Sequence, residues 1–152
     1  MNSQAKQQRI PTVARYLLGV IFFVFGLNGF LNFLPAPPLP EGPAGAFIGG
    51  LVTSGYMFPL IKGTEVLAAI ALLSNRFSPL ALIVLAPVTV NIVLFHAILA
   101  PAGIILPLVV LAAHLTAAWG YRSLYQPLLV AKPAVVPASE PARVDRAASA
   151  TA

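Results

Sequence analysis

The apolar residues of this chain fall into long blocks, unlike the short periodic patterns of soluble domains. The blocks run from Val13 to about Leu34, from about Phe58 to Leu73, from about Leu80 to Leu99 and from about Ile104 to Gly120. A block of about 20 apolar residues matches the helix length that crosses the hydrocarbon core of a bilayer. The pattern predicts an all-α membrane protein, a four-helix bundle whose membrane domain covers residues 13–122.

The segment between the first two blocks is too interrupted to span a membrane. Prolines crowd residues 35–43 and deprive the backbone of amide donors, which predicts an extended loop. From Ala46 to Gly55, larger apolar residues alternate with glycines and hydroxyl-bearing residues at helical spacing. We expect a short interfacial or re-entrant helix here, between the first and second spans.

Composition supports the membrane assignment and limits the chemistry. Of the 152 residues, 59% are hydrophobic and only 9% are charged, whereas soluble domains carry roughly 25% charged residues. Four spans use about 80 residues, which leaves no room for a separate soluble catalytic domain. Any chemistry must therefore lie among the spans. The chain contains no cysteine, which excludes disulfides, thiol catalysis, Cys-ligated zinc and iron–sulfur clusters within this polypeptide.

The basic residues indicate orientation in the membrane. The net charge is +5, but the positive residues are scattered and form no stripe that would follow a nucleic-acid backbone. Eight of the nine lie near the start of the first span, after the second span or after the fourth, and the ninth, Lys62, lies within the second span. Residues 35–57 and 100–103 contain none. The positive-inside rule then places both termini in the cytoplasm, with the protein in the inner membrane of a double-membraned cell.

The two ends of the chain differ in character. The basic start precedes an apolar run of about 22 residues, longer than the core of a signal peptide, so we interpret it as a retained span. Residues 1–12 are then a cytoplasmic N-terminal segment. Residues 123–152 are rich in alanine and proline and poor in large apolar side chains, which predicts a disordered cytoplasmic tail.

Polar residues inside the spans are the main candidates for function. Lys62 and Glu65 are three apart on the second span and can neutralise each other on one helix face. At about 1.5 Å per residue, the polar residues of all four spans lie in the outer half of the membrane or near its midplane. We therefore expect one outward-facing polar pocket. Its other predicted ligand-binding residues are Asn28, Asn32, Asn91, His96 and His114.

Glu65 is the first choice for a catalytic role, because a carboxyl group withdrawn from water can exchange protons near neutral pH. Structural roles remain open for every one of these residues. The three asparagines could be hydrogen-bond partners between helices. Lys62 could extend to the headgroups with Glu65 as its only partner, and either histidine could serve packing alone.

No metal site is expected. His96 and His114 differ in depth by about 10 Å, which argues against shared coordination of haem or metal, and no HxxxH, HExxH or ExxH motif occurs. The glycines of the first span, at positions 19, 26 and 29, should allow close helix approach without forming a nucleotide loop.

Several short motifs, taken together and in order, resemble the DoxX family over about residues 12–125. They are Arg15-Tyr-Leu-Leu-Gly, Phe25-Gly-Leu-Asn-Gly-Phe, Ser54-Gly-Tyr, Pro59-Leu-Ile-Lys-Gly-Thr-Glu and Asn91-Ile-Val-Leu-Phe-His. The resemblance implies a four-helix membrane protein. Some members of that family are associated with quinone-linked sulfur oxidation or with membrane oxidoreductase complexes. Mechanisms that need cysteine pairs cannot operate in this chain.

We therefore expect a DoxX-like inner-membrane subunit or accessory of a redox system, with a hydrophobic small molecule such as a quinone in the outer-half pocket. Lys62 or His96 would bond a quinone carbonyl, and Glu65 would exchange protons. The chain carries no motif for an intrinsic cofactor. Expected partners are the lipid bilayer and oxidoreductase subunits, and homo-oligomerisation stays open. The alternatives are a small-solute transporter and a non-catalytic assembly scaffold.

Overall fold

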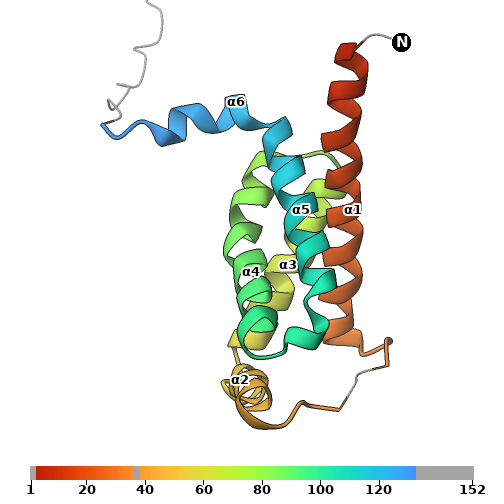
Figure 1. Cartoon of the computed structure of the whole chain (residues 1–152), viewed down its shortest axis with the longest axis vertical. Helices are drawn as coiled ribbons and strands as arrows, with labels where there is room; N and C mark the ends of the chain where they lie inside the picture. Colours follow the sequence, from red (N-terminus) through yellow and green to blue (C-terminus); the bar gives the residue numbers. More distant parts are fainter. Residues whose placement is uncertain (1–2, 36–37, 133–152) are drawn as a thin grey trace, which may run out of the picture.

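The structure, a computed structural model, describes residues 3–35 and 38–132, and this part of the chain is helical with no strand. The helices are α1 (Ser3–Leu31), α2 (Gly42–Thr53), α3 (Met57–Leu73), α4 (Ser78–Ile98), α5 (Ile105–Gly120) and α6 (Arg122–Tyr125) (Figure 1). Two 3-10 turns, η1 (Pro101–Gly103) and η2 (Gln126–Leu129), complete it. The predicted all-α class is confirmed.

Four of these helices pack side by side in a closed ring of contacts. α1 packs on α3 and α5, and α4 packs on the same two helices. Figure 1 shows α2 lying across one end of this group, while α6 and the start of α1 lie at the other end. We refer to these as the α2 end and the α6 end.

The lengths and apolar character of the helices suit a membrane. Residues Arg9–Leu31 of α1 and all of α4 are each long and apolar enough to cross one. α2 with α3, bent by 85°, and α5 with α6 and η2, bent by 77°, qualify only as bent pairs. The outer surface carries many large exposed apolar side chains, among them Val20, Leu67 and Leu115. The structure therefore offers two to four candidate spans, consistent with a membrane protein.

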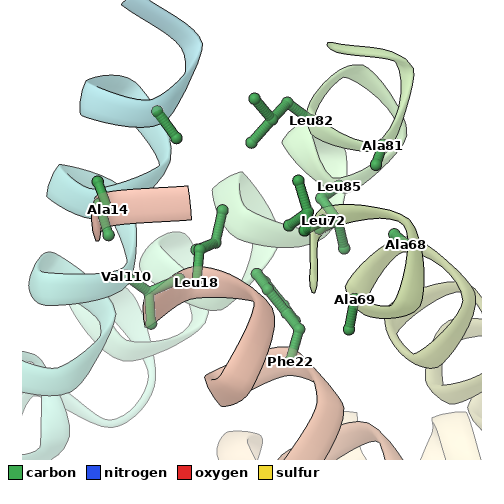
Figure 2. Packing of buried hydrophobic residues seen from close by; sticks show 12 residues of the cluster. Ala14, Leu18, Phe22, Ala68, Ala69, Leu72, Ala81, Leu82, Leu85 and Val110 are labelled. Atoms are coloured by element: carbon green, nitrogen blue, oxygen red, sulfur yellow. The ribbon is translucent and has the colours of Figure 1, made fainter. Parts of the chain in front are cut away.

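The core between the helices combines a few leucines with many alanines. Leu18, Leu72 and Leu85 are fully buried, and Figure 2 shows them converging from α1, α3 and α4. Ala69 and Ala117 are equally inaccessible. Small side chains let helix backbones approach closely, which favours association where lipid is as apolar as the protein.

Glycines bring α1 close to two neighbouring helices. A Cβ atom built on Gly19 would lie 2.9 Å from Leu73 Cδ2, near the end of α3. A Cβ atom built on Gly26 would lie 2.9 Å from Val66 Cγ2, and one built on Gly29 would lie 2.5 Å from Lys62 Cγ. At the α6 end, a Cβ on Gly120 of α5 would lie 2.5 Å from Pro11 Cβ of α1. The prediction that the first-span glycines permit close approach is confirmed.

The chain ends and the loop helix differ from the predicted boundaries. α1 begins at Ser3, well before Val13, because the hydrophobic block marks the apolar part of a helix and not its start. The short loop helix is confirmed but begins at Gly42, with Pro43 in its first turn. Helical turns also occupy the start of the predicted tail, through Leu129. The rest of that tail, from residue 133, lies outside the described residues.

We expect Gly26→Ala to lower the free energy of unfolding by about 2 kcal/mol, because the added methyl group overlaps Val66. The matched control is Gly63→Ala in α3, where a Cβ meets nothing within 4 Å and helix propensity favours alanine. Reversible unfolding in mixed micelles, followed by circular dichroism, measures both variants. Equal stability of the two would contradict the glycine contact between α1 and α3.

Candidate ligand-binding site

An ion pair on α3 forms the polar centre of the site. The Lys62 ammonium donates a hydrogen bond to Glu65 Oε2 at 2.8 Å, across the i, i+3 spacing of the helix. The Glu65 side chain is only 3% exposed and that of Lys62 is 20% exposed. The predicted mutual neutralisation of these charges is confirmed, with the carboxylate as the more deeply buried partner.

His96 approaches from α4, and its ring is oriented by its surroundings. A carbonyl oxygen only accepts hydrogen bonds, so Nδ1 of His96 donates to the Ile92 carbonyl at 2.9 Å. In the neutral imidazole, Nε2 then presents a lone pair. Gly103 of η1 packs on the ring, since a Cβ there would lie 2.9 Å from His96 Cδ2. The imidazole is therefore a positioned hydrogen-bond acceptor.

These three residues line one cavity of about 280 Å³. Its remaining walls are mostly apolar and come from α1, α4, η1 and α5, among them Phe22, Phe25, Ile92, Leu106, Pro107 and Val110. The site also has hydrogen-bonding capacity beyond the bonds described above, provided by the second carboxylate oxygen of Glu65, the further protons of Lys62 and Nε2 of His96. A few polar groups on an otherwise apolar wall are typical of small-molecule sites.

Comparison of the chain with protein-family models, curated proteins and solved structures gives no match. The chemistry of the cavity is therefore the basis for interpreting the site. Within residues 3–35 and 38–132, no group of three histidine, aspartate or glutamate side chains could hold a metal ion.

Asn28 and Asn32 lie at the end of α1, where they shape the backbone. Asn28 Oδ1 accepts a hydrogen bond from the Leu34 amide at 2.7 Å. Asn32 is exposed and adopts a left-handed conformation with φ of 49°, which asparagine tolerates well at helix ends. Neither residue lines the cavity that holds Glu65. Their contacts support the structural alternative for both.

Asn91 faces a different part of the surface. It is exposed on α4 and lines a separate groove of about 190 Å³, together with Phe47 of α2 and Leu94 and Phe95 of α4. The Phe47 and Phe95 rings lie 5.6 Å apart across this groove. The structure therefore does not bring Asn91 to the Lys62–Glu65 pair.

His114 is buried between α4 and α5, away from the lining of the cavity. Its Nδ1 lies 2.9 Å from the Thr89 hydroxyl, and both residues are almost inaccessible. Buried polar groups in a membrane domain need such partners, because no water is present to replace them. This arrangement supports a packing role for His114.

Two polar residues, Arg15 and Ser78, are buried although the sequence did not predict their burial. Arg15, interpreted only as an orientation signal, is 3% exposed, and its guanidinium donates to the Leu72 carbonyl near the end of α3. Ser78, at the start of α4, has the one buried side-chain oxygen without a partner in the described part of the chain. The position of Arg15 two residues inside the apolar block was an available signal. Ser78, which precedes Pro79, is predicted from the sequence to be a helix N-cap, but that prediction is wrong, because Phe77 is the N-cap and Ser78 is the first residue of α4.

We expect Lys62→Met to lower the free energy of unfolding by about 3 kcal/mol, because it leaves the Glu65 carboxylate buried without its counter-charge. Glu65→Gln should cost less, since it leaves no buried anion and Lys62 can extend towards water. Reversible unfolding in mixed micelles compares the two variants. The double variant is the control and should recover much of the loss, and a fully additive loss would contradict the pairing.

We expect Thr89→Val to lower the free energy of unfolding by about 2 kcal/mol, because His114 Nδ1 loses its buried partner. Thr116→Val is the matched control, since that hydroxyl bonds only the Ala112 carbonyl of its own helix in the observed contacts. Its effect should stay within about 0.5 kcal/mol. Thermal unfolding in mild detergent distinguishes them, and a neutral Thr89→Val would argue against the buried pair.

Proposed function

We propose that this protein is a DoxX-like inner-membrane subunit or accessory of a redox system that binds a hydrophobic small molecule such as a quinone. In this proposal α1, α3, α4 and α5 form a four-helix bundle across the membrane, with both termini in the cytoplasm. The motifs shared with the DoxX family support this fold, and the cavity around Lys62, Glu65 and His96 supports the binding role.

The distribution of charge favours the proposed orientation. The α6 end carries Arg9, Arg76, Arg122 and Lys132, whereas the connection between α1 and α2 carries Glu41 and no described basic residue. Cytoplasmic loops of membrane proteins carry an excess of lysine and arginine. The α6 end is then cytoplasmic, and the cavity lies in the outer half of the membrane.

The observation that carries the proposal is the presence of three hydrogen-bonding side chains on the wall of one mostly apolar cavity. Lys62 can donate to a carbonyl oxygen, while His96 Nε2 and the Glu65 carboxylate can accept from a hydroxyl. A quinone presents carbonyls when oxidised and hydroxyls when reduced, and it supplies the capacity to carry electrons. In the proposed complex Lys62 and His96 orient the head, and Glu65 holds or releases the accompanying proton.

The packed core favours binding over transport. Towards the α6 end, the fully buried side chains of Leu18, Leu72 and Leu85 occupy the space between the helices. A transport path would need free polar groups or water past these side chains. The buried Arg15 and the Thr89–His114 pair also lie beyond the cavity, but their polar groups bond within the protein. A scaffold role is the remaining alternative, in which the Lys62–Glu65 pair stabilises the helices and binds nothing.

We expect a decyl-tailed benzoquinone kept in its reduced hydroquinone form to bind the purified protein in nanodiscs. Its affinity should fall about tenfold in Glu65→Gln and in His96→Ala, because each variant changes a group that accepts a hydrogen bond from a ligand hydroxyl. Loss of one hydrogen bond costs about 1.4 kcal/mol, which corresponds to that factor. Equilibrium titration with circular dichroism of each variant separates lost binding from lost folding.

Thr64→Val is the matched control on α3, because the Thr64 hydroxyl bonds the Leu60 carbonyl of the same helix and does not line this cavity. Unchanged quinone binding in both site variants would reject the proposed site. Solute uptake into proteoliposomes would instead favour the transporter, and intact partner complexes without any quinone binding would favour the scaffold.

A further inference from the structure

The cavity has a buried polar floor and an exposed apolar rim. Glu65 and Phe22 are almost inaccessible, whereas Phe25 is 44% exposed and Leu106 is 49% exposed. Gly103 is exposed as well. The exposed wall residues therefore belong to α1 on one side and to η1 and α5 on the other, which places the mouth of the cavity between α1 and α5.

The helix contacts explain why an opening lies there. At the α2 end, Gly26 and Gly29 bring α1 close to α3. The close glycine contact between α1 and α5 is at the opposite end, where Gly120 meets Pro11. On α5 the residues that line the cavity near the α2 end are Leu106 and Pro107, and no glycine lies among them.

The rim lies at the level of lipid. Phe25 is six residues before the end of α1 at Leu31, which is about 9 Å along the helix axis. Leu106 follows the first residue of α5. In a chain that spans the bilayer, an opening over this range faces the region below the headgroups and the upper part of the acyl chains.

We propose that the cavity is filled sideways from the bilayer, by an amphiphile with a small polar head and a hydrocarbon tail. This proposal rests on the proposed function and specifies its ligand class and its route of entry. The head reaches Lys62, Glu65 and His96, while the tail lies between Phe25 and Leu106. The cavity volume of about 280 Å³ is just below the range of small-molecule sites, about 300 to 1,000 Å³. It therefore suits a head group without its tail.

Photolabelling tests where the tail lies. The probe is a decyl-tailed benzoquinone with a diazirine at the end of the tail, bound to the full chain in nanodiscs and mapped by mass spectrometry. Labels on α1 around Phe25 and on the first turn of α5 are expected. Labels confined to α2, or to the outer faces of α3 and α4, would overturn the proposed mouth.

A pair of leucines provides a matched kinetic test. Leu106 and Leu108 are both 49% exposed on α5, but only Leu106 lines the cavity. Leu106→Trp should slow association and release of the tailed quinone about tenfold by narrowing the mouth, and Leu108→Trp should leave both rates unchanged. Equal rates in the two variants would overturn the lateral route.

Tail-free benzoquinone added from water separates this proposal from the proposed function. If its reduced hydroquinone form binds, and Glu65→Gln weakens that binding about tenfold, the site stands whatever the labelling shows. Misplaced labels or equal rates in the leucine variants then reject only the lateral mouth. If neither the tailed nor the tail-free quinone binds the wild-type chain, the proposed function and the lateral route are both rejected.

Discussion

The ion pair between Lys62 and Glu65 is the interaction on which the site depends. A carboxylate that is almost inaccessible is costly in a membrane domain unless a counter-charge lies within hydrogen-bond distance. Lys62 meets that requirement from the same helix at 2.8 Å. Gly29 of α1 makes room for the side-chain stem of Lys62. The neutralisation of Glu65 on α3 therefore depends on the close packing of α1.

The same packing determines the shape of the cavity. Glycines draw α1 to α3 at the α2 end and to α5 at the α6 end, and leucines and alanines fill the space between the helices. The cavity adjoins the contact between α1 and α3, since Lys62 and Glu65 line it, and extends beside Phe25 and Leu106. Its polar groups are therefore held by rigid helices, a condition that favours a defined binding geometry.

The sequence predicted the helices better than it predicted which residues share the site. Block lengths placed the four long helices to within a few residues apart from the start of α1, and the i, i+3 spacing correctly joined Lys62 to Glu65. Depth alone could not group residues from different helices. Asn91 and His96 are five apart, about 140° around the helix, so one faces a separate groove while the other lines the cavity. Which residues face the cavity depends on how each helix is rotated about its axis, and that rotation is determined by packing against neighbouring helices.

The contact between Gly103 and His96 gives the short connection from α4 to α5 an unusual constraint. Surface loops ordinarily accept insertions and sequence changes with little effect. Here a Cβ atom added to Gly103 would lie 2.9 Å from His96 Cδ2, so we expect a side chain at that position to displace the ring and its free nitrogen. No described residue of the loop between α1 and α2 lines the cavity, so we expect changes in connection length to disturb the site less there than at η1.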